Sequence, residues 1–394
     1  MRAVVRALWL IVGGVLMMAG PALAEPYFAV REGFRCSACH TNMSGGGKRT
    51  DLVNTHARDI LHYPSFFGKF SNPPAFFSGE VNQYVAFGAD LRATNTAVFQ
   101  DQGINGRVDN NKAFRGRLDT DTFDVTEAVL YGEVRLIPDY LSVYVDQRLQ
   151  PQTDNREAFA MVHGVLPWDG YIKAGRMFLP YGLQIQDDSA FIRGAKGSGS
   201  ANTGFSFDQQ EGGVEVGFEP GPVTLIACLS NGPPGDRDLR VTATAYTMFT
   251  DLPVVRNVFA GSSFSRVGPP GSQATRFGFF AGSNLERFTY LGEADFLSDR
   301  NAQTNGRSIG RFVAYGEGDY LFFDWLNFKV AVDYADNDGT LTDTNDDENR
   351  VSVGFEPFLN RFLQPRIFYR VSNGVRSQAT HNQNVLLAEA HVFF

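Results

Sequence analysis

The feature that most constrains the fold of this chain is a long series of short segments in which apolar and polar residues alternate. Clear examples lie at 128–136 (AVLYGEVRL), 141–146 (LSVYVD), 240–246 (RVTATAY) and 328–334 (FKVAVDY). Alternation with a period of two is typical of β-strands that have one apolar and one polar face. After the N-terminus, no apolar run approaches the roughly 18 residues that a membrane-spanning helix needs. The pattern therefore predicts an all-β protein whose sheet has two chemically different faces.

Segments of this kind recur across residues 76–394. Sixteen strands are expected, starting near residues 78, 123, 139, 157, 169, 211, 222, 239, 256, 275, 286, 309, 325, 350, 362 and 384. Their connections alternate between short turns, such as 137–139 and 219–222, and longer polar loops, such as 94–117 and 180–210. Outer-membrane barrels have an even number of strands, short periplasmic turns and long outer loops. We therefore predict a 16-stranded antiparallel transmembrane β-barrel in the outer membrane of a Gram-negative cell; a soluble β-sandwich or barrel is the alternative.

The same alternation assigns the wall residues to two sides. Val143, Val145 and Leu130, together with Ala128 and Val134, are expected to face lipid. Charged residues are expected to face the interior, namely Glu127, Glu133, Arg135, Asp146, Arg148, Lys173, Glu293, Asp295, Glu317, Asp319, Lys329 and Asp333. A soluble barrel needs a dry core, whereas a large membrane barrel can enclose water or a plug. The charged interior therefore favours the membrane barrel.

The first 24 residues have the parts of a secretory signal peptide. Arg2 and Arg6 supply positive charge, residues 7–20 (ALWLIVGGVLMMAG) are almost wholly apolar, and Ala22 and Ala24 supply small residues for cleavage. This arrangement predicts export and cleavage after Ala24. An uncleaved membrane anchor is the alternative.

Residues Cys36-Ser37-Ala38-Cys39-His40 read C-x-x-C-H, the attachment pattern of a c-type haem. Two thiols at this spacing can form thioethers to the two vinyl groups of one porphyrin, and the adjacent histidine then lies under the iron. The alternatives are a disulfide between Cys36 and Cys39, or a thioredoxin-like redox pair, which needs a βαβ setting. We predict one covalent haem c on Cys36 and Cys39, with His40 as a metal ligand. The third cysteine, Cys228, is expected to have no role.

A haem that transfers electrons commonly has a second axial ligand, usually Met or His. Residues 52–63 predict a short helix with His56 in the middle of its apolar face and His62 on its polar face. His56 is therefore the predicted distal metal ligand. The alternatives are His62, a barrel residue such as His163, or water.

The segment that carries the haem motif is too small to bury a core of its own without the haem. A connector rich in Pro and Gly, residues 66–75, separates it from the first strand. We therefore divide the chain into a signal peptide (1–24), a monohaem cytochrome segment (25–75) and a barrel (76–394). The cytochrome segment is expected to fold into or against the periplasmic mouth of the barrel.

Charge excludes one class of partner. The chain has 43 acidic and 35 basic residues, so it lacks the positive charge that would neutralise a nucleic-acid backbone. The loop 336–348 (DNDGTLTDTNDDE) is rich in carboxylates but lacks the spacing of an EF-hand. It is interpreted as an exposed acidic loop, with calcium binding as the alternative.

Two resemblances follow from these motifs. Residues 26–49, from Pro26 through the C-x-x-C-H motif to the Gly-rich tail that ends at Arg49, resemble the start of the fused outer-membrane cytochrome–porins. That resemblance implies one c-type haem before a sixteen-strand barrel, with Cys36, Cys39 and His40 as the corresponding haem residues. Iron-oxidising members of that group pass electrons inward across the outer membrane. Residues 175–182 (GRMFLPYG), followed by 187–191, are similar to the phosphate-selective type of porin, which we interpret as barrel ancestry and not as phosphate binding.

Together these patterns predict an electron-transfer protein. Its haem would carry electrons between an extracellular donor or acceptor and periplasmic c-type cytochromes, with outer-membrane lipid around the barrel. The main alternative is a porin or channel whose haem segment acts as a plug or redox sensor. A haem enzyme such as a peroxidase is a further alternative, and it would need an open distal site. Electron transfer is favoured over substrate conversion because no general acid or nucleophile is required.

Overall fold

The structure, a computed structural model, describes residues 26–50, 63–71, 77–100, 117–185, 187, 189–193, 210–232, 238–269, 273–300, 308–336, 347–374 and 382–394. Several sequence predictions fall outside the described residues. They are the signal peptide, the distal ligand His56, its alternative His62, and residues 337–346 of the acidic loop.

Within these ranges the chain forms one sheet of 17 strands, each antiparallel to its neighbours. The strands are β1 (Glu80–Asn82), β2 (Val85–Gln100), β3 (Arg117–Ile137), β4 (Leu141–Gln150), β5 (Asp154–Leu166), β6 (Gly170–Phe178), β7 (Gln210–Phe218), β8 (Val223–Ser230), β9 (Arg240–Phe249), β10 (Asn257–Val267), β11 (Ala274–Leu285), β12 (Phe288–Asp299), β13 (Ile309–Phe323), β14 (Leu326–Asp336), β15 (Asp347–Pro357), β16 (Leu363–Asn373) and β17 (Asn384–Phe393).

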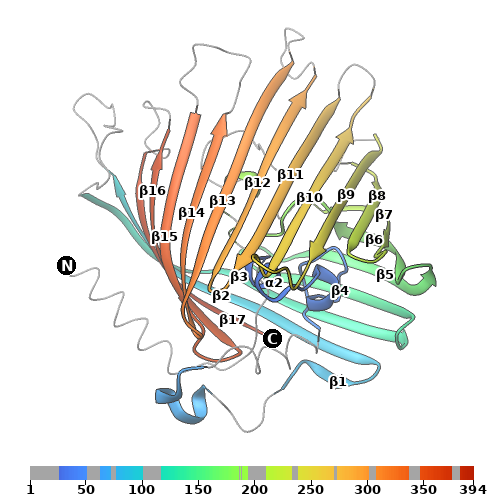
Figure 1. Cartoon of the computed structure of the whole chain (residues 1–394), viewed down its shortest axis with the longest axis horizontal. Coiled ribbons are helices and arrows are strands. Elements are labelled where there is room, and N and C mark those ends of the chain that lie inside the picture. Colours follow the sequence, from blue (N-terminus) through green and yellow to red (C-terminus); the bar gives the residue numbers. More distant parts are fainter. Residues whose placement is uncertain are drawn as a thin grey trace.

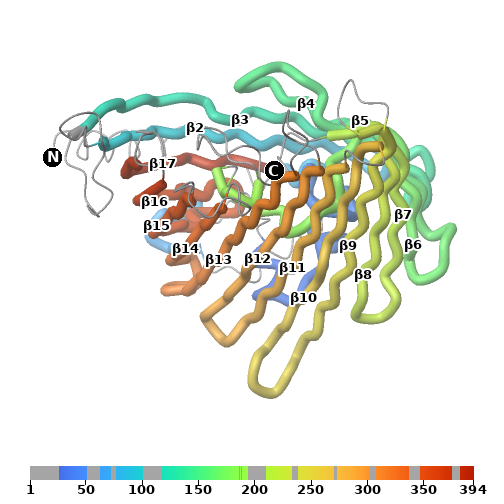
Figure 2. The backbone as a smooth tube through the Cα atoms, turned by 90° about the horizontal axis from the view of Figure 1, so that it is seen from above, coloured from blue at the N-terminus to red at the C-terminus, as the bar shows by residue number. Residues whose placement is uncertain are grey.

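The long strands β2 to β17 close into a ring. Each pairs with the next along the chain, and β17 pairs back onto β2 from Asn384↔Phe99 to Phe393↔Asp90 (Figures 1 and 2). The three-residue strand β1 only extends the lower end of β2. Closure leaves no free edge, so the backbone groups of the wall are satisfied within the sheet. The predicted 16-stranded antiparallel barrel is confirmed for the part of the chain that the structure describes.

The strand positions differ from the sequence prediction mainly at β2 and β3. The loop expected at 94–117 was wrong in its first part, because β2 continues to Gln100 and β3 already begins at Arg117. Residues 118–124 of β3 are all exposed. Where both faces of a hairpin meet solvent, the apolar alternation that marks a strand is lost. The sequence signal therefore ends before the strands do.

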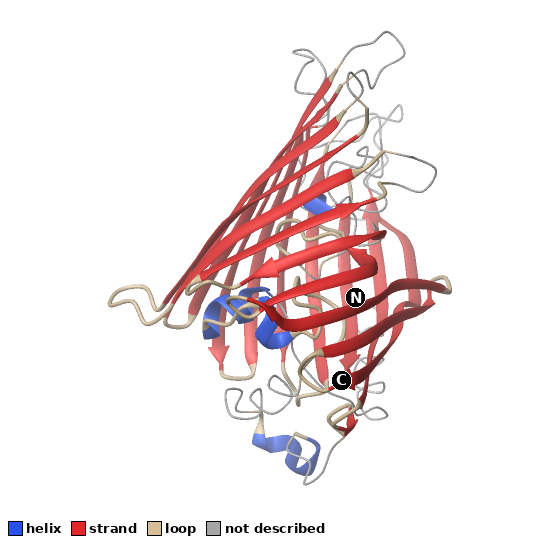
Figure 3. Ribbon diagram, turned by 90° about the vertical axis from the view of Figure 1, so that its right-hand side faces the viewer, coloured by secondary structure: helices blue, strands red, loops and turns tan. Residues whose placement is uncertain are grey.

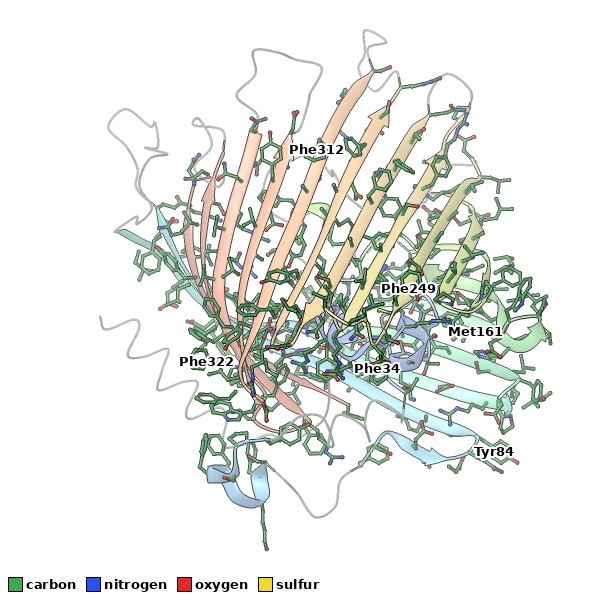
Figure 4. All side chains as sticks on the ribbon, in the orientation of Figure 1. Phe34, Tyr84, Met161, Phe249, Phe312 and Phe322 are labelled. Carbon is green, nitrogen blue, oxygen red and sulfur yellow. The ribbon has the colours of Figure 1, made fainter. Side chains whose placement is uncertain are left out.

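The outer face of the wall is apolar. Leu130 is 51% exposed and Val134 43%, in agreement with their predicted outward orientation. Exposed aromatic side chains lie on the lower half of this face, among them Tyr84, Phe249 and Phe322 (Figure 4). Aromatic residues concentrate where membrane barrels meet the lipid–water interface. The outer surface is thus the kind that a bilayer would cover.

The inner face is largely polar. Most of the charged residues predicted to face the interior are buried there, including Asp146, Lys173 and Asp333. The interior is also occupied by two segments of the chain. Residues 26–50, called the plug here, lie inside the lower part of the barrel at the end where the short turns lie (Figures 1 and 3). Residues 179–185, 187 and 189–193, called the strap here, cross the lumen after β6 (Figure 2).

Few helices are present among the described residues. The plug contains α2 (Pro26–Glu32) and the single turn α3 (Cys36–Cys39), and the strap ends in η3 (Phe191–Arg193). The segment η1 (Ser65–Phe70) lies at the lower rim, where Phe66 contacts Trp325 and Asn360 donates a hydrogen bond to the Phe70 carbonyl. None of the described helices is long and apolar enough to cross a membrane.

Candidate functional site in the barrel lumen

The C-x-x-C-H motif is held in a small hairpin of the plug. Thr41 N–H donates to the Lys48 carbonyl and Thr50 N–H donates to the Cys39 carbonyl, so His40 pairs directly with Arg49. The turn between the two arms is Gly45-Gly46-Gly47, where all three residues have positive φ. Glycine is favoured in this left-handed region because it has no Cβ. At position 47 a Cβ would also overlap the Tyr144 hydroxyl, so the sequence GGG suits both the turn and the wall beside it.

The motif faces a cavity of about 300 Å³ between the plug and the barrel wall. Cys36, Cys39 and His40 line it from the plug. From the wall it is lined by apolar and aromatic side chains on one side and by charged groups on the other, including Tyr246, Met248, Phe259, Asp90, Arg92 and Arg156. The residues predicted to hold a haem therefore lie together at one enclosed space in the lumen.

Both cysteines of the motif are free thiols in the structure, and their surroundings keep them protonated. Burial raises the pKa of the Cys39 thiol to about 12, and the nearby Cys36 thiol adds to the shift. Burial also raises the pKa of Cys36, which the Tyr246 hydroxyl partly offsets. Thiol–disulfide enzymes depend on a lowered thiol pKa, so the thioredoxin-like alternative is disfavoured.

His40 has the properties of a histidine that is available to bind a metal. Its Nδ1 atom is buried and has no hydrogen-bond partner among the described residues. Burial, and then the positive charge of Arg49, lower the pKa of His40 to about 3, so the imidazole is neutral at physiological pH. Neutral imidazole is the form that binds a metal. The two thiols, the neutral histidine and the adjacent cavity together fit a covalently attached haem.

The structure does not bring a second histidine of the sequence prediction to this cavity. His163 lies near the lower end of β5 and is not among the described residues that line the cavity. His391 of β17 is buried in the lumen, where it bonds Asp90 at 3.0 Å. Among the described residues, no group of three or more His, Cys, Asp or Glu side chains is arranged to hold a bare metal ion. The identity of a distal ligand stays a prediction for His56.

Buried polar contacts fix the plug to the wall. Asn42 has 0% exposure, donates to Glu157 Oε1 at 3.1 Å and accepts from Lys173 Nζ at 2.9 Å. Lys173 in turn pairs with Glu215 at 2.8 Å, and all three charged groups are fully buried. Asn42 of the plug therefore adds a hydrogen bond to each of two buried wall residues that also have partners within the wall.

Further contacts secure the N-terminal half of the plug. Ser37 and Arg35 both bind Glu219 in the turn between β7 and β8, at 2.8 and 3.1 Å. Asn257 donates to the carbonyls of Val30 and Arg31 at the end of α2. The helix α2 also buries Tyr27, Phe28 and Val30 among apolar residues of the lumen. The plug thus uses the barrel as the core that its own length cannot supply.

The strap closes another part of the lumen. Gly182 N–H donates to Ser263, Leu183 N–H to Glu293, and Phe191 N–H to Asp333, so the strap is bonded to the wall at both of its ends. Asp187 pairs with Arg350 at 3.3 Å and Arg370 at 3.0 Å. Between the strap, the start of the plug and β13 to β17 lies a second cavity of about 250 Å³. Its lining includes both basic and acidic groups, among them Lys329, Arg366, Glu317 and Glu389.

Comparison with known proteins identifies the fold. No protein-family model matches the chain, and no curated protein matches its sequence. In-vitro folded OmpT of Vibrio cholerae, in its trimer form, is a similar structure with 14% identity and a TM-score of 0.54 over 79% of this chain and 99% of that chain. The chain has a porin-like β-barrel fold.

Two further solved structures give the same result for the porin-like barrel. The outer membrane channel DcaP of Acinetobacter baumannii has 10% identity and a TM-score of 0.53, covering 79% of this chain and 97% of that chain. OprB of Pseudomonas putida has 8% identity and a TM-score of 0.51, covering 85% of this chain and 98% of that chain. At such low identity the likeness is one of fold.

Sequence reasoning found the plug residues of this porin-like barrel but missed the wall residues that complete the site. Tyr246 was assigned only to an alternating strand and Met248 was not singled out, although their spacing does put both on one face of that strand. Arg49 was assigned only to the tail of the motif. The sequence alone gives little indication that Arg49 lies at the site, because its position opposite His40 depends on the exact length of the glycine turn.

Proposed function

We propose that this chain is an outer-membrane electron-transfer protein with one haem c bound inside a porin-like barrel. Cys36 and Cys39 would form its thioethers and His40 would be its proximal ligand. Its partners would be periplasmic c-type cytochromes and an extracellular electron donor or acceptor. The observation that carries the proposal is the position of the C-x-x-C-H motif, which faces an enclosed cavity within the lumen.

When bound, the haem would supply one-electron chemistry at iron. The residues of this chain have four tasks around it. The two cysteines tether the group, and His40 is kept neutral by burial and by Arg49. Contacts of Arg35 and Ser37 with Glu219 fix the motif relative to the wall. The apolar residues of the cavity exclude water and so influence the reduction potential.

The barrel has a clear role in this proposal. A bilayer blocks electron flow, and the apolar band of a membrane barrel is about 25 Å tall. One haem does not span that distance. The haem must therefore sit well inside the barrel, where a partner protein can approach it from the end with short turns. The plug lies inside the barrel at that end, and this supports the proposal.

A second candidate is a porin or channel in which the haem segment is a plug or redox sensor. The porin-like fold favours this candidate more directly than it favours electron transfer. Ion flow through such a channel requires that the plug leave its position in the lumen, or that an open path for ions remain beside the plug. Both candidates predict covalent haem, and they differ in whether ions or electrons cross the barrel.

The first test is a haem stain and a reduced-minus-oxidised spectrum of the outer-membrane fraction. The wild-type chain should carry covalent haem, and a Cys36→Ala, Cys39→Ala chain should insert in the membrane without it. Absence of covalent haem from the wild type would end both candidates.

The second test uses liposomes that contain the purified protein. Electron transfer to an acceptor trapped inside, with little ion conductance, supports the electron-transfer proposal. Conductance that is the same with and without haem, without electron transfer, supports the passive channel. The Cys36→Ala, Cys39→Ala chain is the matched control, because it keeps the barrel and the plug but cannot attach the haem.

A further inference from the structure

Arg49 is a buried cation without a direct counter-charge in the described part of the chain. It is 6% exposed, and its Nε atom has no hydrogen-bond partner there. The guanidinium lies 4.0 Å from the centre of the Phe393 ring, and its side chain forms no ion pair with any described residue. Burial lowers the pKa of Arg49 to about 10, which still leaves it charged.

Burying an unpaired charge is strongly unfavourable, and a cation–π contact returns only part of that cost. Asp90 is an acid whose charge acts on Arg49. However, Asp90 already bonds His391 at 3.0 Å and pairs with Arg92 at 3.3 Å. The negative charge of Asp90 therefore attracts the Arg49 guanidinium without forming an ion pair with it. This indicates that an anion binds next to Arg49.

The direction of the Arg49 side chain indicates where that anion would bind. Arg49 is directly opposite His40 in the plug hairpin, and the hydrogen bonds flank this pair instead of joining it. Side chains of such a non-hydrogen-bonded pair leave the same face and lie close together. Both side chains accordingly line the same cavity, together with Cys36 and Cys39.

Other arginines of this cavity have carboxylate partners of their own. Arg148 pairs with Asp154 at 2.7 Å, and Arg156 pairs with Asp146 at 3.1 Å. Arginine binds a carboxylate through two parallel hydrogen bonds, which makes it the preferred partner for such a group. Arg49 differs from Arg148 and Arg156 in having its guanidinium available for an incoming carboxylate.

We propose that Arg49 binds a propionate carboxylate of the haem that is attached to Cys36 and Cys39. The inference rests on the proposed haem, and it adds a residue that positions the porphyrin by an ion pair. A haem carries two propionates, and a propionate in an enclosed cavity needs a positive partner. Arg49 would hold one of them on the same side of the plug as His40.

The test compares Arg49→Met in two forms of the full-length chain. One form is made in a host that attaches haem to C-x-x-C-H motifs, and the other in a host that does not. Stability is measured as the temperature at which the folded barrel is lost on heating in detergent. In the haem-loaded protein Arg49→Met should lower this temperature, because it leaves a propionate unpaired. In the haem-free protein it should raise the temperature, because it removes an unpaired buried cation.

Four comparisons make the result specific. Arg148→Gln should change both forms in the same direction, since its partner is Asp154 and not the haem. Arg49→Lys should recover part of the stability of the loaded form, and the haem propionate bands in resonance Raman spectra should shift in Arg49→Met but not in Arg148→Gln. Added acetate should stabilise the haem-free wild type and leave the loaded wild type unchanged.

The outcomes separate the two proposals. If the wild type carries no covalent haem, the proposed function fails and the propionate assignment fails with it. If haem is present but Arg49→Met shifts both forms equally, or leaves the Raman bands unchanged, the haem stands and the role of Arg49 is wrong. If acetate stabilises the loaded protein through Arg49, the site takes a free carboxylate from the lumen and the propionate assignment is overturned.

Discussion

Asn42 is a fully buried polar contact between the plug hairpin and the wall, and Asn42→Ala tests its contribution to plug seating. The side chain joins two charged wall residues, because it donates to Glu157 and accepts from Lys173. A hydrogen bond to a charged group contributes about 1.5–3 kcal/mol. The two wall residues keep other partners, since Lys173 still pairs with Glu215 and Glu157 still accepts from the Phe178 N–H.

Because these partners remain, the loss of the free energy that seats the plug should lie at the lower end of this range, about 3 kcal/mol for the two bonds together. Since each 1.4 kcal/mol is a factor of ten, the unseated fraction should rise on the order of a hundredfold. The barrel itself should remain folded, because Asn42 is outside the sheet. The expected effect is thus on the plug alone.

Thiol labelling measures the unseated fraction in the haem-free protein. Cys228 is replaced by Ala so that only Cys36 and Cys39 react, and the maleimide is carried on a polymer too large to enter the lumen. Under these conditions Cys39, which is buried, reacts only when the plug leaves its seat. The labelling rate of Asn42→Ala should be on the order of a hundred times that of the parent.

Asn155→Ala is the matched control. Asn155 lies in the wall and bonds the carbonyls of Asp146 and Glu157, but it has no hydrogen bond to the described residues of the plug. Its labelling rate should equal that of the parent. Equal rates in Asn42→Ala and Asn155→Ala would show that the buried polar network does not hold the plug, and the reasoning would have to be abandoned.

Two further predictions concern the strap and the glycine turn. Asp187→Asn should increase ion conductance in planar bilayers, because the strap loses both of its arginine pairs. Burial raises the pKa of Asp187, but the two arginines outweigh burial and hold it below its ordinary value. The stabilisation from these two pairs is therefore complete above the unfolded pKa of about 3.9 and is lost as the pH falls through the lower folded pKa, so the ratio of Asp187→Asn to wild-type conductance should be the same at about pH 5 and about pH 8. Gly47→Ala should raise the plug labelling rate about fivefold or more, since φ is +67° and a Cβ would meet the Tyr144 hydroxyl, which adds at least about 1 kcal/mol. Gly46→Ala is its control, because its φ is also positive but a Cβ there would meet no atom within 4 Å, and a rate as high as that of Gly47→Ala would contradict the role of Tyr144.

The sequence predicted the barrel well because a membrane wall imposes a strict period of two. Strands such as β9 and β17 begin within one residue of the positions expected at 239 and 384. Inward residues such as Asp146 and outward residues such as Leu130 were assigned correctly for the same reason. The prediction weakened at β2 and β3, where the hairpin is longer than expected and residues 118–124 of β3 are exposed and mostly polar.

The candidate site could be predicted only in its local part. Cys36, Cys39 and His40 were found because their chemistry depends on adjacent positions in the chain. Arg49 and Tyr246 take part through the folding of the plug into the lumen, and no spacing in the sequence encodes that contact. The strap was expected as an outer loop, yet bonds such as Leu183 N–H to Glu293 hold it inside the barrel. Long-range partners of this kind depend on the closed wall.

The strength of plug seating distinguishes the two candidate functions. An electron carrier needs its haem at a fixed distance from its partners, so the plug should stay seated in both redox states. A redox-sensing channel needs the opposite. In such a channel a change in iron charge must change the free-energy difference between the seated and unseated plug by several kcal/mol to open most of the pores. The buried network joins Asn42 in the hairpin of His40 to Lys173 in the wall, so it is a contact that such a shift would have to break. Since three fully buried charged groups and their partners would be exposed together, the network favours a plug that does not move. Accordingly, plug movement measured on reduced and oxidised protein should be the same if the chain carries electrons.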